Sequence, residues 1–341
     1  MPYRTRMAPG KSGISVVICT FNGSARLPSV LKSVIDQKFD STLFELIVVD
    51  NASQDDTAAL CIQALSLAQV NFNWQVVSEP VPGLNHARRK GLSTSDFEFV
   101  LFCDDDNILS EYYLKTGFEI LTQNQFVGAL GGCGVPSFDG EKPEWFDQYS
   151  HSFAVGPQSG SDGKLHELPA ELYGAGTFFR RSPILSFFEN GFQTVMSDRK
   201  GKSLASGGDV EWCYLVQLAG YQVWYDHRLT FEHQMFNNRM RWSYYLKLKE
   251  GIASGTGLLF SYVSVLKDPQ MGILTYISRW LGISIFSAML YFKHVTRLIF
   301  TRKPQDAEME LTRLIIKAKT FSYWRNGWRS LKHFRQLKRL S

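Results

Sequence analysis

The sequence lacks the markers of several protein classes. Its five cysteines are an odd number and include no Cys-x-x-Cys pair, so we predict neither a disulfide framework nor a zinc site. No segment repeats at a period of about 20–50 residues, which argues against solenoids and propellers. Glycine follows no Gly-X-Y register, which excludes collagen. Four cysteines lie in apolar runs, so we expect the cysteines to be small buried side chains in a reducing compartment.

The sequence also shows no signal peptide and no clear membrane span. The N-terminal segment MPYRTRMAPGKSG is basic, but no apolar stretch of the signal-peptide kind follows it, so we expect the body to stay in the cytoplasm. Residues 280–292, WLGISIFSAMLYF, are thirteen uncharged residues between Arg279 and Lys293. A transmembrane helix needs about 20 apolar residues. We therefore expect this segment to lie in a membrane interface or in a protein core.

Charge is distributed unevenly along the chain. Residues 293–341 hold thirteen Lys/Arg and three acids, a net charge of +10, whereas the whole chain carries +5 and residues 1–292 therefore carry −5. Aromatic residues alternate with these cations: Phe321, Tyr323, Trp324, Trp328 and Phe334. A basic, aromatic-rich tail favours contact with an anionic surface. The apolar segment upstream favours a membrane over nucleic acid, and a solvated amphipathic helix is the alternative.

Apolar residues are abundant enough for a large folded core. They make up 44% of the chain, against 20% charged residues, which excludes wholesale disorder. Short apolar runs alternate with stretches of helical periodicity, and these runs are the predicted strands: 14–19, 44–49, 74–78, 97–103 and 126–130. Continuously apolar strands that alternate with helices are typical of a mostly parallel sheet covered on both faces.

The pattern is less regular after residue 133. Residues 134–172 are rich in Gly, Ser, Pro and Asp and are expected to form long loops near the site. A strand over 173–179, a helix over 208–219 and a short strand over 221–225 follow. The body is expected to end near residue 250.

Polar residues stand where the predicted strands end. Thr20 follows the first strand, Asp50 the second, and Asp104, Asp105 and Asp106 the fourth. Ligands of such sheets bind beyond the carboxyl ends of the strands, so these residues mark the site. Three adjacent carboxylates repel one another unless they are solvated or neutralised by a cation such as Mg²⁺ or Mn²⁺. Asp104 and Asp106 can address one ligand while Asp105 turns aside; an Asp-rich turn or cap is the alternative.

Four further motifs suggest chemistry, each with a structural alternative. Asp50 can accept a hydrogen bond from a ring N–H or a ribose hydroxyl, or it can cap the following helix, a role that Asp55 and Asp56 fit better. Arg88, in GLNHARRKG, can face phosphates, whereas its neighbours favour a solvated helix face. Asp209, in GGDVE, can act as a general base or cap a helix. His233 taken by itself is more often structural, and it joins the site only through the resemblance below.

The order and spacing of these motifs resemble those of the inverting family 2 glycosyltransferases, which have a GT-A fold. The resemblance runs from about Ser15 to His233. Its segments are SVVICTFN, FELIVVDNASQDDT, GLNHARRKGL, FVLFCDDDN, YGAGTFFRR, SGGDVEWCYLVQLAG and YQVWY. Cys19 and Phe21 stand where the family usually has Pro and Tyr, Arg89 where Asn is common, and Gly208 where Glu is usual.

The resemblance implies a role for each matching residue. Thr20, Asp50, Arg88 and Asp104 would bind the nucleotide, with Asp50 accepting from a uracil-type N3–H. Asp106 would ligate a divalent metal, Mg²⁺ or Mn²⁺, and His233 would complete the metal site. Asp209 would remove the proton of the acceptor hydroxyl. Four more residues are expected beside the acceptor or behind these groups: Asp105, Glu211, Gly174 and Trp145.

The expected protein is thus an α/β enzyme with a GT-A-type sheet and a helical, membrane-associating C-terminal appendage. Its expected parts are an N-terminal extension (1–13), a glycosyltransferase domain (14–250) and a basic helical region (251–341). It would move a sugar from a nucleoside-diphosphate sugar, expected to be a UDP-sugar, to a glycan or lipid-linked glycan at the inner face of the cell membrane, with no nucleic-acid partner. The alternatives are a sugar-nucleotide nucleotidyltransferase and a non-enzymatic membrane-bound polysaccharide-assembly protein. No G-x-G-x-x-G follows the first strand, which argues against a dinucleotide enzyme.

Overall fold

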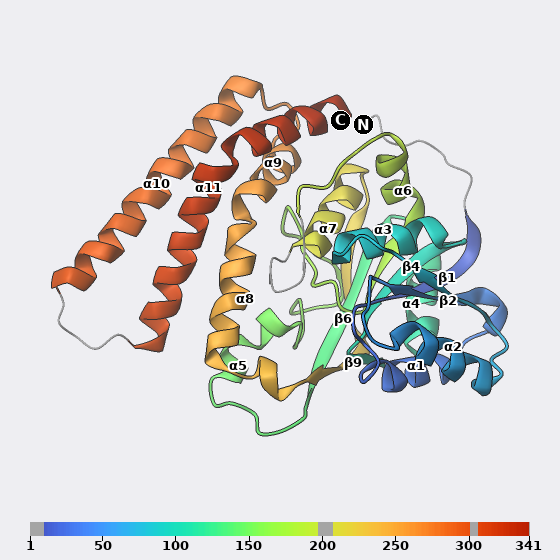
Figure 1. Cartoon of the computed structure of the whole chain (residues 1–341). Helices are drawn as coiled ribbons and strands as arrows, with labels where there is room; N and C mark the ends of the chain where they lie inside the picture. The colour runs from blue at the N-terminus through green and yellow to red at the C-terminus, as the bar shows by residue number, and fades with distance from the viewer. Residues whose placement is uncertain (1–9, 197–206, 301–305, 341) are drawn as a thin grey trace. The chain divides into compact units, whose positions relative to one another are not determined.

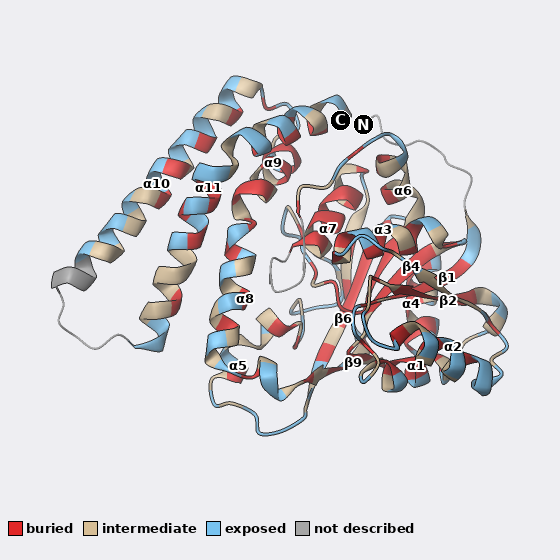
Figure 2. Cartoon of the chain, in the orientation of Figure 1, coloured by how far each residue is buried: buried red, intermediate tan, exposed pale blue. Residues whose placement is uncertain are grey.

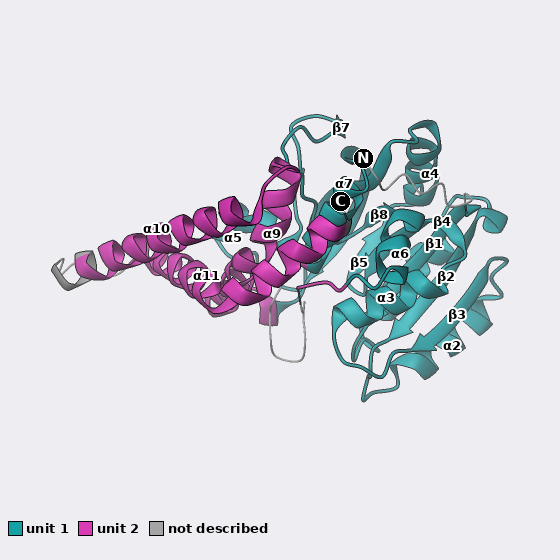
Figure 3. Ribbon diagram, turned by 90° about the horizontal axis from the view of Figure 1, so that it is seen from above, with its two compact units in different colours: residues 1–192, 208–237 teal, residues 193–207, 238–341 magenta. Residues whose placement is uncertain are grey.

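The computed structural model describes residues 10–196, 207–300 and 306–340 (Figure 1). The chain divides into two compact units (Figure 3). The first comprises residues 1–192 and 208–237, and the second comprises residues 193–207 and 238–341. The first unit contains every residue that the sequence nominated for the site.

The unit boundaries differ from those expected. The division falls at residue 237 rather than 250, because helix α8 (Trp242–Ser254) packs on α11 (Ala307–Leu340). Of the expected N-terminal extension, residues 1–9 lie outside the described residues, and strand β1 already begins at Lys11.

The first unit is built on one mixed sheet. Its strands in spatial order are β3 (Asn73–Ser78), β2 (Phe44–Asp50), β1 (Lys11–Thr20), β4 (Phe97–Asp104), β8 (Thr177–Arg180), β6 (Val127–Phe138), β9 (Gln222–Met235) and β5 (Asn107–Leu109), and β7 (Gly163–Lys164) pairs with β9. Strands β3, β2, β1 and β4 are parallel, whereas β8 runs antiparallel to β4 and β6. The expected α/β sheet flanked by helices is confirmed.

Helices cover both faces of this sheet, which explains why its strands are continuously apolar. The adjacent residues Val16 and Val17 of β1 point to opposite faces, and both have 0% exposure. Val16 belongs to a core shared with α1 (Leu27–Ile35), α2 (Thr57–Ala68) and α4 (Tyr113–Gln123). Val17 lies under α3 (Leu84–Thr94), and α6 (Arg181–Glu189) and α7 (Gly208–Leu218) complete that face. Figure 2 shows the buried strands between the two helical layers.

Two strands differ in length from their sequence patterns. Strand β9 runs to Met235, well beyond the expected 221–225, because β6 pairs with it in parallel as far as Phe138. Main-chain hydrogen bonds along this ladder extend both strands into segments that have little apolar periodicity. The expected 134–172 loops therefore contain the end of β6 as well as α5 (Phe146–Tyr149). In the other direction, the expected strand 173–179 is shorter and begins only at Thr177.

The second unit is helical. Besides α8 and α11 it contains α9 (Thr256–Lys267) and α10 (Ile273–Phe300). Small residues bring α9 against α11: the Gly257 amide donates to Ser322 Oγ (3.0 Å), and Ser322 Oγ donates to the Ser254 carbonyl (2.5 Å). Aromatic rings fill the contact between α10 and α11, as in Trp280 and Tyr323, whose centroids are 5.4 Å apart. The expected helical C-terminal region is confirmed.

The five cysteines all lie within the described residues and form no disulfide, and Cys61, Cys103 and Cys213 are buried. Burial raises the pKa of the Cys61 thiol to about 11, and Asp50 and Asp55 add to this rise. The thiol is therefore protonated at neutral pH and packs as a small apolar group.

Candidate active site

The carboxyl ends of three neighbouring strands meet at one edge of the sheet. The register pairs Thr20 of β1 with Asp50 of β2, and Cys19 of β1 with Asp104 of β4. Because parallel strands run in one direction, their last residues lie side by side at this edge. Three of the nominated nucleotide-binding residues, Thr20, Asp50 and Asp104, are thus brought together. Asp50 and Asp104 are partly exposed, whereas Thr20 is buried.

Asp105 is held by residues of the first strand and the loop after it. Its Oδ2 accepts from Thr20 Oγ1 (2.7 Å) and from Arg26 Nη2 (2.6 Å), and its Oδ1 accepts from Arg26 Nε (3.2 Å). The side chains of Arg26 and Asp105 are 24% and 13% exposed, so this is a partly buried bidentate ion pair. The Thr20 hydroxyl proton is therefore engaged by Asp105. Arg26 was not nominated from the sequence, and its only signal there is its place just after the first strand.

Asp106 lies beside His233. The Nε2 of His233 is 3.4 Å from Asp106 Oδ1, and the two residues are only 8% and 3% exposed. Strand pairing causes this proximity: Asn107 of β5 is opposite His233 of β9, and the Gln234 amide donates to the Asp106 carbonyl (2.9 Å). Within the described part of the chain, His233 Nδ1 is buried without a hydrogen-bond partner. A buried carboxylate next to an imidazole is a donor set that fits a divalent cation such as Mn²⁺.

Asp209, Gly174 and Arg88 form a third group. The Gly174 amide donates to Asp209 Oδ2 (2.7 Å). A Cβ at position 174 would lie 2.8 Å from Arg88 Nη2 and 3.2 Å from Asp209 Oδ2, so only glycine leaves room for both side chains. Gly174 just precedes β8, which is antiparallel to β4, so this group reaches the same edge of the sheet as Asp104. Arg88 is 5% exposed, while Asp209 is partly exposed.

Asn51 is a structural residue of the site that sequence reasoning missed. Its Nδ2 donates to the carbonyls of Glu79 (3.0 Å) and Val81 (2.7 Å), and its Oδ1 accepts from the Gly83 amide (2.7 Å). These bonds fix the loop that leads into α3, the helix that carries Arg88. Gly83 has φ +140°, a conformation that favours glycine. The only sequence signal was the position of Asn51 directly after Asp50.

Two nominated residues lie in other surroundings. Glu211 is 0% exposed within α7. Trp145 precedes α5 and lies in an aromatic cluster, with its ring 6.1 Å from Phe153 and 6.4 Å from Phe146. Arg89, one residue beyond Arg88, is exposed and lies 4.5 Å from the Phe188 ring, as its assignment to a helix surface implied.

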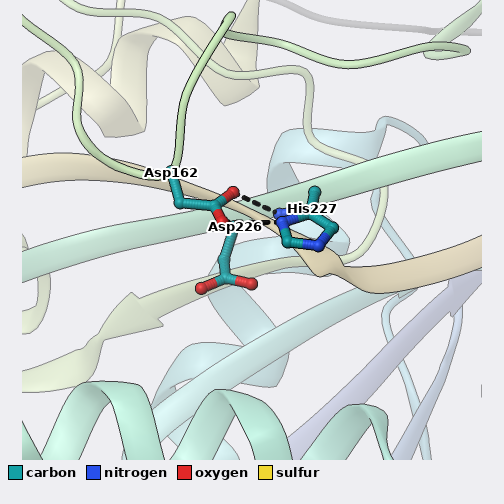
Figure 4. Close-up of side chains that lie close together, drawn as sticks. All are labelled: Asp162, Asp226 and His227. Carbon is teal, nitrogen blue, oxygen red and sulfur yellow. Dashed lines mark hydrogen bonds and ion pairs between the residues drawn. The ribbon is translucent and has the colours of Figure 1, made fainter.

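A second cluster of metal-type side chains lies elsewhere in the first unit. Asp162, Asp226 and His227 place one ligand atom each within 4.8 Å of one another (Figure 4). These groups already pair with protein: His227 Nδ1 is 2.6 Å from Asp162 Oδ2, and Arg228 binds Asp226 at 2.9 and 2.8 Å. Burial raises the pKa of Asp226, but its hydrogen bonds to Arg228 and the charge of Arg228 outweigh this and lower the pKa below 3.8. The cluster is best described as an ion-pair network.

Comparison with known sequences identifies the family. The profile of "Glycosyl transferase family 2" matches residues 15–188, half of the chain, and spans the strand ends with Thr20, Asp50 and Asp104. The chain belongs to this family. It is therefore a glycosyltransferase, as the motifs indicated, rather than the alternative non-enzymatic assembly protein.

Curated members of the family are similar in sequence to part of this chain. A glucosyl-dolichyl phosphate glucuronosyltransferase of Haloferax volcanii is 23% identical over 66% of this chain and 70% of its own length. The poly(ribitol-phosphate) beta-N-acetylglucosaminyltransferase TarP of Staphylococcus aureus is 30% identical over 36% of this chain and 37% of its own. A GalNAc(5)-diNAcBac-PP-undecaprenol beta-1,3-glucosyltransferase of Campylobacter jejuni is 33% identical over 35% and 38%. The match thus spans well under half of the last two relatives.

Solved structures share the fold of the chain. S. aureus TarS 1–349 in complex with UDP-GlcNAc superposes with a TM-score of 0.54 over 96% of this chain and 90% of that one, at 13% identity. The mannosyltransferase PcManGT of Pyrobaculum calidifontis, in complex with GDP-Man and Mn²⁺, gives 0.52 over 97% and 76%, at 14% identity. These likenesses show the GT-A-type fold that the sequence predicted.

Proposed function

We propose that this glycosyltransferase transfers a sugar from a UDP-sugar to an acceptor hydroxyl with inversion at the anomeric carbon. The observation that carries the proposal is the meeting of Asp209, Gly174 and Arg88 at the edge where β1, β2 and β4 end. This edge combines a partly exposed carboxylate, a buried guanidinium and the polar strand ends. UDP is the favoured nucleotide because Asp50, at the end of β2, can accept from a uracil N3–H.

Asp209 is the proposed general base. The Gly174 amide holds its Oδ2, and its Oδ1 accepts from the Val210 amide (2.9 Å). A carboxylate oxygen has a second lone pair, so Oδ1 can still take the proton of the acceptor hydroxyl as that oxygen attacks the anomeric carbon. Arg88 would bind the departing diphosphate and stabilise its growing negative charge. Because acceptor and diphosphate occupy opposite faces of the sugar, a single displacement inverts the configuration.

Asp106 and His233 are the residues that would hold a divalent cation, and Asp104, at the end of β4, would bind the nucleotide. Such a cation, when bound, neutralises the diphosphate and makes it a better leaving group. Asp105 is not part of this donor set, because Arg26 and Thr20 bind its carboxylate.

The acceptor is proposed to be a glycan or a lipid-linked glycan at the cytoplasmic face of the cell membrane. The names of two relatives contain dolichyl phosphate and undecaprenol, and that of a third contains poly(ribitol-phosphate). These acceptors differ chemically, so the loops of this chain, rather than its sheet, are expected to decide among them.

The test is a donor screen with the full-length protein. A panel of UDP-, GDP- and dTDP-sugars is incubated with Mn²⁺, with Mg²⁺ or with EDTA, and the released nucleoside diphosphate is measured without acceptor. We expect slow release from one UDP-sugar that EDTA abolishes. The variant Asp106→Asn should lose this release, whereas the matched variant Asp162→Asn, in the ion-pair network, should retain it. Release from a GDP-sugar alone, or equal release in EDTA, would contradict the donor or the metal assignment.

A further inference from the structure

Helices α10 and α11 form an antiparallel hairpin with defined contacts. Going up α10, the Tyr276 ring stacks on Phe334 (4.1 Å between centroids), the Trp280 ring lies 5.4 Å from that of Tyr323, and the Ser287 carbonyl accepts from Thr320 Oγ1 (3.0 Å). The α11 partners descend in number as those of α10 rise. Residues 320–334 of α11 therefore lie alongside residues 276–287 of α10.

Each helix carries an exposed apolar stripe beside this contact. On α10, Leu281, Ile285 and Phe292 are 53%, 55% and 65% exposed. At 100° per residue they fall within an arc of about 40°, roughly 120° around the helix from Trp280, whereas Met289 and Phe286, 65% and 59% exposed, lie farther around at about 180° and 240°. On α11, Phe321, Trp324 and Trp328 are 43%, 61% and 73% exposed. Gly327 of α11 lies under the Trp280 ring and marks the contact with α10. The three side chains fall within an arc of about 60°, roughly 100° around α11 from Gly327, counted in the same sense of rotation as on α10.

The two stripes share one side of the hairpin. Antiparallel helices in contact are related by an approximate twofold axis, so equal rotations away from the contact lead to the same side. Helix α9 packs on the opposite side of α11, where His333 Nδ1 is 2.7 Å from Ser261 Oγ. We call the surface formed by Leu281, Ile285, Phe292, Phe321, Trp324 and Trp328 the hairpin face.

Cations border the hairpin face. Arg325 and Lys332 of α11 are exposed. Counted around α11 in the same direction as the apolar stripe, they lie about 150° from Gly327, at the outer rim of the face. The Arg325 guanidinium lies 5.3 Å from the Phe321 ring. Tryptophan and phenylalanine beside Lys and Arg are the side chains that enter the interface of an anionic bilayer, with rings at head-group level and cations on phosphates.

The same contacts argue against a membrane-spanning α10. Residues 273–296 are long and apolar enough to span by length and composition, and 17% of that segment is buried within the protein. However, the middle of this segment lies beside the stretch of α11 from Lys319 to Arg325, and both of these cations are exposed. A spanning α10 would take these cations into the hydrocarbon core, where charged side chains are costly. An orientation in the plane of the interface leaves them at the phosphates.

We propose that the hairpin face docks in the plane of an anionic lipid bilayer, without crossing it. Trp324 and Trp328 are its anchors, and Arg325 and Lys332 select anionic lipid. This inference goes beyond the proposed function, since docking requires neither a nucleotide nor an acceptor.

The test uses full-length protein and phosphatidylcholine vesicles with or without phosphatidylglycerol, in a flotation assay. We expect binding only with phosphatidylglycerol, with partial release in high salt. The double variant Arg325→Gln/Lys332→Gln should bind about 30-fold more weakly, and Trp324→Ala/Trp328→Ala at least about tenfold more weakly. The matched controls on exposed sites of the first unit, Lys115→Gln/Lys164→Gln and Leu67→Ala/Phe126→Ala, should bind as the parent does.

Depth distinguishes docking in the plane from spanning. The fluorescence of Trp324 and Trp328 is the part that is lost in Trp324→Ala/Trp328→Ala. Lipids brominated near the head group should quench it more than lipids brominated near the chain end. Alkaline carbonate should release the protein from the vesicles. Stronger deep quenching, or resistance to carbonate, would overturn the proposal. It would also be overturned if both double variants bound like the parent, or if the parent ignored the vesicles and formed a dimer that the tryptophan variant abolishes. UDP-sugar hydrolysis is measured for every variant. If it is retained, the variant is folded, and a failure of membrane docking leaves the proposed function unaffected.

Discussion

The three consecutive carboxylates of the site occupy different surroundings. Asp104 ends β4 and is partly exposed, Asp105 pairs with Arg26, and Asp106 is buried beside His233. A turn at Asp105 and Asp106 separates β4 from β5, so successive side chains diverge. The three side chains therefore do not alternate as they would in an extended segment, because a turn and strand pairing decide where each one points. Asp105 nevertheless differs from Asp104 and Asp106, as the sequence predicted.

The first residue-scale prediction concerns Asp105. The variant Asp105→Asn should retain most of its turnover while it destabilises the fold by about 2 kcal/mol, because a partly buried charge-assisted pair with Arg26 is lost. Denaturant unfolding measures the stability and acceptor-dependent UDP release measures the turnover. Arg26→Gln is the matched control and should reproduce the loss of stability. If Asp105→Asn abolished turnover as completely as Asp106→Asn, the assignment of Asp105 to a supporting role would be wrong.

The second concerns Asp209. Asp209→Asn retains an oxygen that can accept from the Gly174 amide, but it cannot take a proton. We expect UDP affinity to be unchanged and turnover to fall by about 10²–10⁴, the usual range for loss of a general base. Calorimetric titration with UDP and steady-state kinetics separate the two effects. The control Asp147→Asn, in an exposed pair with Lys142, should leave both unchanged. Near-normal turnover in Asp209→Asn would move the base to a residue of the 134–172 segment.

At the scale of elements, α11 depends on a buried histidine. His333 is 2% exposed, and burial lowers its pKa to about 3 from the ordinary 6.5. The Ser261 hydroxyl donates to the Leu258 carbonyl (2.9 Å), so the Nδ1–H of neutral His333 donates to Ser261 Oγ. The charged imidazolium could make the same bond, so it is the burial of the ring between α9 and α11 that favours the uncharged imidazole.

The buried His333 makes the stability of the fold depend on pH. The folded pKa lies below the unfolded one, so stability is complete above about pH 6.5 and is lost as the pH falls toward 3, because the unfolded chain takes up a proton first. At about pH 5 the loss should be about 2 kcal/mol. Denaturant unfolding at pH 5 and 7.5 measures it. His333→Asn, whose amide can still donate to Ser261, should be less stable at pH 7.5 but less sensitive to pH, whereas the exposed-site control His166→Asn should behave as the parent. Equal pH sensitivity in His333→Asn would rule out this explanation.

At the scale of the whole molecule, nucleotide binding should stabilise the fold by mass action. A ligand present at 100 times its dissociation constant adds about 2.7 kcal/mol if it binds only the folded state. We expect UDP with Mn²⁺ to raise the melting temperature of the full-length protein, and EDTA to remove most of the increase. Asp106→Asn should show no dependence on Mn²⁺, while Asp162→Asn should respond as the parent. A shift that persists unchanged in EDTA would argue against a metal between the protein and the diphosphate.

The sequence by itself determined the sheet and half of its active edge. The apolar strands are long enough to fix a parallel register, and Thr20, Asp50 and Asp104 follow them directly, so their proximity could be predicted from strand ends alone. The glycosyltransferase family could likewise be recognised from the order of the motifs. Local apolar periodicity and strand polarity are properties of short segments, which is why a linear reading is sufficient for them.

Only the tertiary structure decided which side chains share a group. Gly174, Arg88 and Asp209 come from three distant segments and meet because β8 enters the sheet antiparallel to β4. His233 reaches Asp106 because β9 extends far beyond its apolar core and pairs with β5. In the C-terminal helices, the sequence left open whether Trp280 faces a membrane or a core, and it grouped Tyr323 and Phe334 with the other aromatics of the tail. Each of these three is at most 8% exposed, while Trp324 and Trp328 stay exposed. Both sets consist of aromatic residues, and only the rotation of each helix about its axis, which packing against its neighbours fixes, decides which rings are buried.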